Sequence, residues 1–366
     1  MREQDFTPEQ EVLFWAIQLD GYPVLPEMKL LEREMGWPSL RRMAVDHGVL
    51  PLLYRKLKAL EQNPAPAKEM VRFRELYLAN SGANLNKELK LVKILELLSA
   101  QGIEAAVFKG PALALQAFGD PSLRQYMDLD ILIHQRDLRS VYELMVDAGY
   151  TPQFPVDNKR EKWLVKSDIA LQFSGQDGLL VEVHWEMCER SDFFNIGSEA
   201  VWQNLQTVLL QGKEVRVPAP EHSLIMLWLH GFRHRWDRLK LVADLIHMVH
   251  SCSGQGRQVI ADAREKLPPR YRDRFIRDIT TPRILARAVF FPGSYRGMKE
   301  HFSDLAAEIF KPRPSDWIAV DLPDFLYPLY YLIRPVRLAV KYGRSSLRSL
   351  FSFRKSAIDR QQSGNQ

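Results

Sequence analysis

The sequence predicts an α+β fold in which a central segment of strands and helices lies between two helical regions. Residues 1–100 repeat apolar side chains at helical spacing, residues 101–217 alternate short apolar strands with helices, and residues 218–350 return to helical spacing. Residues 351–366 form a basic and polar tail. A chain of 366 residues exceeds one typical domain of roughly 100–200 residues, so two or three packed units are expected.

The N-terminal region is predicted to be helical throughout. Residues 11–17 and 85–98 carry apolar side chains with the period of a helix. Pro64 and Pro66 separate these stretches, because proline does not continue a helix.

The central segment opens with a strand, a tight turn and a helix. Residues 103–108 form the strand, Lys109, Gly110 and Pro111 the turn, and residues 112–118 the helix. Gly110 lets the backbone approach a ligand, Pro111 suits a first helical position, and the start of a helix favours an anion. Lys109 adds positive charge, so this unit predicts a phosphate site.

Two carboxylates alternate in the apolar strand 127–133, which a helix over 137–148 follows. Asp128 and Asp130 share one face of a strand. They repel each other unless a cation lies between them, and Mg²⁺ prefers carboxylate oxygens while keeping positions free for phosphate. Arg124 precedes them and has the planar fork that binds phosphate. Asp-x-Asp alone recurs by chance, so the surrounding motifs support the metal interpretation.

A third acid lies in the apolar run 179–185, which a strand over 169–173 precedes. Glu182 and His184 share one face, and pairing of this strand beside the Asp-x-Asp strand would complete a cluster of three carboxylates. Sheet packing of His184 and Trp185 and a solvated Glu182 are the structural alternatives. The valines that flank Glu182 favour an inward-facing polar row.

The C-terminal region opens at residues 218–220, which read Pro-Ala-Pro, and stays helical through residue 250. His230 and His234 have metal-ligand spacing, yet neither a Glu between them nor a third ligand is evident. Histidines that pack in the core, or that contact the residues of the site without binding a metal, are therefore preferred over metal ligands. Lys240 and Asp244 are most simply an ion pair within one helix, and substrate contact by Lys240 is the lesser alternative.

Together these motifs resemble the nucleotidyltransferase fold of the DNA polymerase β superfamily, and more narrowly its bacterial group of uncharacterised nucleotidyltransferases. The resemblance extends to residues 47–53 and 331–338, so it covers most of the chain. It implies transfer of a nucleoside monophosphate from a nucleoside triphosphate to an unidentified hydroxyl or amine acceptor. The superfamily's usual turn is Gly-Ser or Gly-Gly, whereas this chain has Lys-Gly-Pro and a longer insertion before the acids.

The resemblance also implies roles for individual residues. The catalytic acids, which would bind Mg²⁺ or alternatively Mn²⁺, are Asp128, Asp130 and Glu182. The substrate-binding residues would be Lys109, Gly110, Arg124, His184, His230, His234 and Lys240. Two other functions stay open: a non-catalytic protein that binds a nucleotide or partner, and another metal-dependent phosphoryl-transfer enzyme, although the chain has no Walker loop or kinase signature.

Composition favours a globular protein of the cytoplasm. Hydrophobic residues make up 46% and charged residues 26%, which is not the composition of a disordered chain. The two cysteines, Cys188 and Cys252, fit neither a metal pattern nor a disulfide framework. The sequence does not open with a signal-peptide pattern, and no apolar run reaches the roughly 20 residues of a spanning helix.

Positive charge is concentrated late in the chain, whose formal net charge is +5. Residues 325–358 contain no acid, and their basic residues are Arg334, Arg337, Lys341, Arg344, Arg348, Arg354 and Lys355. A solvated terminal helix is the first interpretation, peripheral contact with a membrane the second and nucleic-acid binding the third.

Overall fold

The protein is described by a computed structural model for residues 5–19, 34–167, 170–187, 198–252, 254–291 and 309–340. By packing, the chain divides into two compact units, residues 1–153 with 169–295 and residues 154–168 with 296–366. The boundaries predicted at residues 100 and 217 stay predictions; both fall inside the first unit, whose helices and sheet pack together.

A mixed sheet with strand order β1-β2-β5-β4-β3 lies in the first unit and confirms the α+β class. The strands are β1 Ala105–Val107, β2 Asp128–Ile133, β3 Thr151–Pro152, β4 Ala170–Ser174 and β5 Leu180–His184. β2 and β5 run parallel, and the other neighbouring pairs are antiparallel. The connecting helices are α6 Gly110–Phe118 and α7 Leu138–Asp147. Both central strands are buried, which matches their near-continuous apolar sequences.

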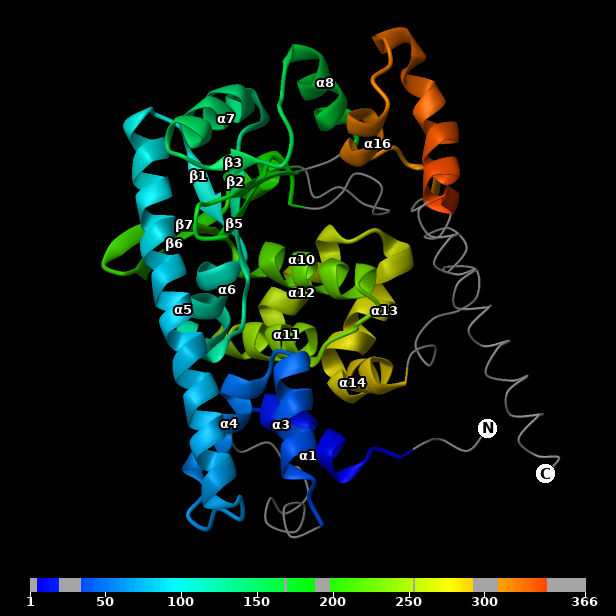
Figure 1. The fold of residues 1–366 in the computed structure, drawn as a ribbon. Helices are drawn as coiled ribbons and strands as arrows, with labels where there is room; N and C mark the ends of the chain where they lie inside the picture. The colour runs from blue at the N-terminus through cyan, green and yellow to red at the C-terminus, as the bar shows by residue number, and fades with distance from the viewer. Residues whose placement is uncertain are drawn as a thin grey trace, which may run out of the picture. The chain divides into compact units, whose positions relative to one another are not determined.

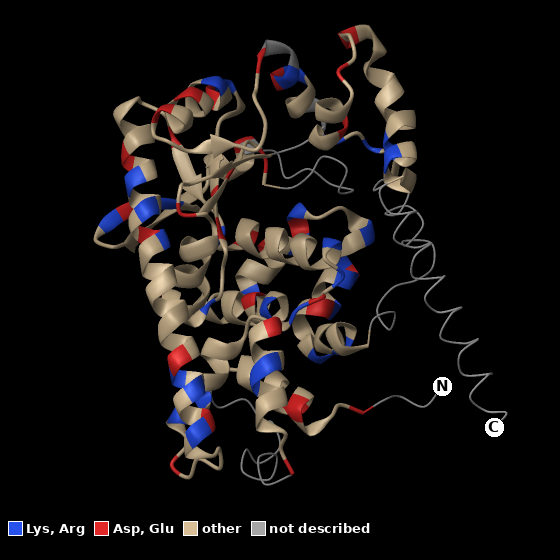
Figure 2. Ribbon diagram, viewed as in Figure 1, with Lys and Arg blue, Asp and Glu red and all other residues tan. Residues whose placement is uncertain are grey.

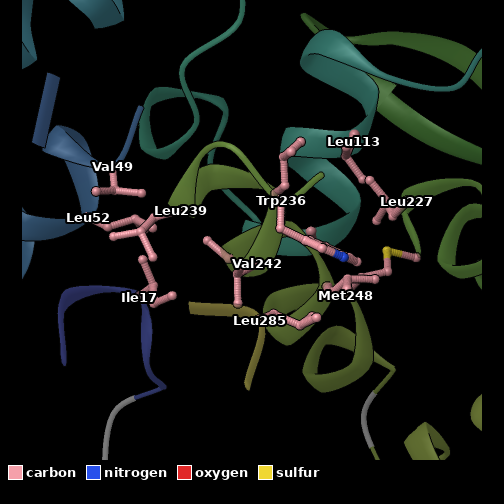
Figure 3. Packing of buried hydrophobic residues seen from close by; sticks show 14 of the residues in the cluster. Ile17, Val49, Leu52, Leu113, Leu227, Trp236, Leu239, Val242, Met248 and Leu285 are labelled. Carbon is pink, nitrogen blue, oxygen red and sulfur yellow. The ribbon is translucent and has the colours of Figure 1, made fainter. Parts of the chain in front are cut away.

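The helices that the structure describes before the sheet are α1 Pro8–Ile17, α3 Trp37–Asp46, α4 Leu50–Ala59 and α5 Ala67–Ala100. The long helix α5 starts directly after Pro66, one of the two prolines predicted to mark a break, and packs on α4, on the short 3₁₀ helix η1 (Pro121–Leu123) and on β1 (Figure 1). Figure 3 shows Ile17 and Leu52 gathered around Leu239 of the C-terminal region. The N-terminal helices therefore share one hydrophobic core with the helices that follow the sheet.

A β-hairpin that the sequence analysis did not identify separates the sheet from the last helices of the first unit. It follows the short helix α9 (Ser198–Trp202), and its strands are β6 Leu205–Leu210 and β7 Lys213–Pro218. Gln211 and Gly212 both have positive φ, 51° and 74°, as a two-residue hairpin turn requires. The Gln-Gly pair is a weaker turn signal than Asn-Gly, and apolar residues cluster in β6 instead of alternating.

Five helices complete the first unit: α10 Pro220–Arg233, α11 Leu239–Ser251, α12 Gly256–Lys266, α13 Pro269–Thr280 and α14 Pro282–Phe290. Charges of both signs are interspersed on α12 and α13 (Figure 2). Between α10 and α11, Arg235 and Trp236 adopt positive φ, 56° and 52°. Trp236 is fully buried, and its ring lies against Gly231, where a Cβ atom would come within 2.2 Å. This strained turn sets where α10 ends and α11 begins.

The described part of the second unit contains α8 Asn158–Ser167, α16 Pro314–Ala319, the 3₁₀ helix η3 Asp324–Leu329 and a helix over 330–340. Trp163, Trp317 and Tyr330 pack edge to face at its centre. Asp316 binds Arg334 at 3.2 Å and also binds Arg337.

The acid-free segment 325–358, here called the basic stripe, thus has two arginines that pair with an acid eighteen or more positions earlier in the sequence. Its other members, residues 341–355, lie outside the described residues, and membrane contact stays a prediction. None of the helices in the described ranges has the length and apolar character needed to span a bilayer.

Candidate functional site

The three predicted acids lie together because β2 and β5 are parallel neighbours. In the register of this pair Asp130 lies beside Glu182, and Asp128 shares their face because it is two residues away on the same strand. Asp130 is buried, Asp128 is half-buried, and the side chain of Glu182 is 29% exposed. The sheet therefore positions three carboxylates at the start of β2 with access for a ligand from one side.

Two hydrogen-bond donors, Lys109 and His184, hold the cluster together. The Lys109 ammonium lies 2.9 Å from Asp130 Oδ1. His184 Nε2 lies 3.2 Å from the same oxygen and 3.3 Å from Glu182 Oε2. The edge of the Phe108 ring contacts the His184 ring, with centroids 4.9 Å apart, and fixes its orientation. A ring nitrogen aimed at two carboxylates donates its hydrogen to them.

These contacts separate the pKa values of the acids. Burial alone would raise the pKa of Asp130, but Lys109 and the hydrogen bond from His184 outweigh it and hold that pKa well below its usual value. The hydrogen bond from His184 lowers the pKa of Glu182 as well. The pKa of Asp128 moves the other way, because burial and then repulsion by Asp130 and Glu182 raise it. Asp128 is the acid that most needs an additional cation.

The donor set fits a divalent metal. In the described part of the chain, Asp130, Glu182 and His184 form a group whose ligand atoms all lie within 4.8 Å of one another. The second oxygen of Asp130, Oδ2, is buried and has no hydrogen-bond partner among the described residues. A buried carboxylate oxygen without a donor costs free energy unless a cation binds it. Carboxylate oxygens are ligands that suit Mg²⁺ or Mn²⁺.

The Lys109-Gly110 turn lies directly against the start of β2. Gly110 has φ of +53°, and a Cβ atom there would lie 3.3 Å from the carbonyl oxygen of Asp128. Because only glycine combines this conformation with so close an approach, the turn brings the N-terminus of α6 next to the acids. A helix N-terminus at this position favours a bound phosphate.

The structure places Arg124 in a buried ion pair. Its Nε and one terminal nitrogen each donate a 2.9 Å hydrogen bond to the two carboxylate oxygens of Asp244, on α11. The predicted ion pair between Lys240 and Asp244 is thus replaced by a bidentate pair that joins the loop before β2 to α11. The phosphate-binding role of Arg124 stays a prediction.

The ends of α10 and α11 face the same cluster. His230 and His234 have ring centroids 4.4 Å apart, and the pKa of His230 is lowered by burial and by the positive charge of Lys109. Burial also lowers the pKa of Lys240, whose charge acts on Asp128. The backbone N–H of Lys240 donates to the His47 carbonyl. Of these three side chains, Lys240 contributes positive charge beside Asp128, while the substrate-binding roles of all three stay predictions.

Residues of α5 also support the site, and the sequence analysis did not identify them. Asn84 is buried and donates to the carbonyl oxygens of Pro121 and Arg124, which fixes the loop before β2. The Tyr126 hydroxyl donates to Glu88 at 3.3 Å. The signal that could have found them is an Asn and a Glu at i and i+4 among the inward positions of an amphipathic helix.

The sequence matches the family described as "Uncharacterised nucleotidyltransferase" over residues 33–266. No curated protein matches the chain.

The solved structures to which the chain is similar include the following three. Lincosamide antibiotic adenylyltransferase LnuA, in its lincomycin-bound form, is 13% identical over 38% of this chain and 83% of its own, with a TM-score of 0.27. The antibiotic-resistance factor ANT(2'')-Ia is 13% identical over 52% and 94%, with a TM-score of 0.37. An antigenic nucleotidyltransferase-like protein from Paracoccidioides brasiliensis is 19% identical over 52% and 93%, with a TM-score of 0.30.

Proposed function

Because the chain belongs to the family of uncharacterised nucleotidyltransferases, we propose that it transfers a nucleoside monophosphate from a nucleoside triphosphate to a hydroxyl or amine, with Mg²⁺ as its cofactor. The acceptor oxygen or nitrogen forms a bond to the α-phosphorus, the bond between the α-phosphorus and its bridging oxygen breaks, and pyrophosphate leaves. We place the reaction in the cytoplasm, where nucleoside triphosphates are available.

The observation that supports the proposal most strongly is the register of β2 and β5. It sets Asp130 beside Glu182 with Asp128 on the same face, next to a glycine turn that opens a helix. Mg²⁺, when bound to these carboxylates, would link them to the triphosphate and stabilise the charge of the leaving pyrophosphate. Asp128, Asp130 and Glu182 are the residues that would hold it.

The chain's own groups supply the other parts of the reaction. Gly110 and the N-terminus of α6 would receive phosphate oxygens beside Asp128, and the charges of Lys240 and Arg124 would offset the negative charge of the transition state. Glu182 is ionised at neutral pH, because its pKa is lowered, and would accept the proton of the acceptor hydroxyl or amine.

The acceptor would bind beside His230 and His234. Burial lowers the pKa of both imidazoles, so both are neutral at pH 7, and each offers one donor and one acceptor nitrogen. Neutral hydrogen-bonding groups suit a hydroxyl or amine better than a charged pair would.

Asp128→Asn tests the metal site without disturbing the ion pair of Asp130. We expect the variant to lose the Mg²⁺-dependent thermal stabilisation by nucleoside triphosphate, which at a hundred times the dissociation constant is about 2.7 kcal/mol in the wild type. Without ligand the variant should be at least as stable as the wild type, because the substitution removes repulsion from Asp130 and Glu182. Asp147→Asn, at an exposed position in α7, is the matched control and should behave as wild type.

The released product separates the proposal from its alternatives. Transfer of the label from an α-labelled nucleotide to the acceptor, with release of unlabelled pyrophosphate, supports nucleotidyl transfer, whereas a labelled nucleoside diphosphate would identify another phosphoryl transfer. Mg²⁺-dependent binding with no released product for any acceptor would support a non-catalytic binding protein. Unchanged nucleotide stabilisation in Asp128→Asn would remove the metal-site assignment.

A further inference from the structure

Lys109 occupies a position inside the acid cluster. It is the last residue before α6, and its Nζ atom lies 2.9 Å from Asp130 Oδ1 with only 19% of the side chain exposed. Its ammonium also lies over the Phe108 ring, 5.1 Å from the centroid. Asp128, Asp130 and Glu182 all act on this one charge. Lys109 is thus a fixed cation among the three carboxylates.

The oxygens of the cluster are unequally available. Asp130 Oδ1 contacts both Lys109 and His184. Both oxygens of Glu182 have partners, since Oε2 lies 3.3 Å from His184 and Oε1 accepts from Gln172 Nε2 at 3.3 Å. Asp130 Oδ2, in contrast, is buried without a partner among the described residues. The Asp128 carboxylate lies on the same face of β2 as this free oxygen.

Space and charge limit what can bind there. Two-metal sites place their ions about 3.5–4 Å apart and bridge them with carboxylate oxygens. A magnesium ion binds oxygen at about 2.0–2.1 Å, so an ion on Asp130 Oδ1 would occupy the space of the Lys109 ammonium. The positive charge of Lys109 already offsets part of the negative charge of the three carboxylates, so the cluster has less need of a second divalent cation.

Building on the proposed function, we propose that the site binds a single divalent cation between Asp128 and Asp130 Oδ2, and that the Lys109 ammonium takes the place of a second ion. Lys109 then stabilises the negative charge of the acids, and Gly110 and the N-terminus of α6 bind the phosphate. Lys109 would thus limit the site to one metal ion instead of two.

The test counts Mn²⁺ ions bound per chain by electron paramagnetic resonance, with the full-length protein and Mn²⁺ alone. Wild type should bind one ion. Lys109→Met, which removes the charge and keeps the length, should bind two ions whose spin coupling broadens the spectrum. Mn²⁺ should also raise the melting temperature of this variant more than that of wild type. Lys109→Arg should still bind one ion.

Lys87→Met is the matched control. Lys87 is a half-buried lysine whose charge acts on Asp128, and its ammonium lies 5.2 Å from the Tyr126 ring centroid, so the variant should bind one ion.

Two ions in wild type would overturn the inference while leaving the transferase proposal intact, and this count requires no variant to fold. One ion in folded Lys109→Met would overturn it equally. Absence of Mn²⁺ from wild type and variants alike would overturn the inference together with the metal dependence of the proposed function.

Discussion

The buried pair of Arg124 and Asp244 gives the most quantitative prediction. Its side chains are 8% and 1% exposed, and two 2.9 Å hydrogen bonds join them across 120 positions of sequence. Asp244→Asn removes the negative charge and presents an amide donor to a buried guanidinium. Removing one partner of a buried ion pair costs about 3–5 kcal/mol, because the other charge stays uncompensated. At about 2 °C per kcal/mol for a large domain, the melting temperature should fall by roughly 6–10 °C.

Urea unfolding followed by circular dichroism measures this loss, in a double-mutant cycle with Arg124→Leu. Asp244→Asn combined with Arg124→Leu should cost less than the two single substitutions added together, since no charge is then left buried. Glu143→Gln is the control, because its pair with Arg139 is exposed and should contribute less than about 1 kcal/mol. A loss below about 1 kcal/mol in Asp244→Asn, or additive single effects, would refute the reasoning.

Two further predictions concern the packing around the site. Burial lowers the pKa of His247 from 6.5 to about 4, so the unfolded chain binds this proton first. Stability present above pH 6.5 should therefore fall by on the order of 3 kcal/mol towards pH 4, and urea unfolding of His247→Leu should show a flatter pH profile. Gly231→Ala should cost about 1–3 kcal/mol in thermal unfolding, because its Cβ atom would overlap Trp236. Gly82→Ala, within α5 and open to solvent, should be neutral or stabilising; equal effects at the two glycines would contradict this account.

Local patterns were sufficient for most elements that carry the site. Alternation in the segment 127–133 predicted β2, and the valines around Glu182 predicted β5. Glycine and proline after residue 109 predicted the turn and α6. Each of these patterns depends only on residues a few positions apart, so it can be recognised in the sequence without the fold. The hairpin of β6 and β7 gave a weaker signal, since its apolar residues cluster in β6 and its turn contains Gln211.

Partners that are distant in sequence were not predictable in this way. Charge spacing along the helix predicted an ion pair between Asp244 and Lys240, four positions away, whereas Asp244 pairs with Arg124 in the fold. Arg334 and Arg337 were expected on a free basic stripe, and Asp316 binds them. An ion-pair partner is decided by which elements pack together, and charge spacing along one helix carries no information about that packing.

The sequence by itself determined the kinds of chemistry available: three acids on two strands, a Lys-Gly turn before a helix, and paired histidines on another helix. Only the tertiary structure decided which of these groups contact one another. The parallel pairing of β2 and β5 set Asp130 beside Glu182, and the turn before α6 sent the Lys109 ammonium into the cluster. The physical reason is that periodicity fixes the face on which a side chain lies, whereas its charge environment depends on burial and on neighbours that folding brings from elsewhere in the chain.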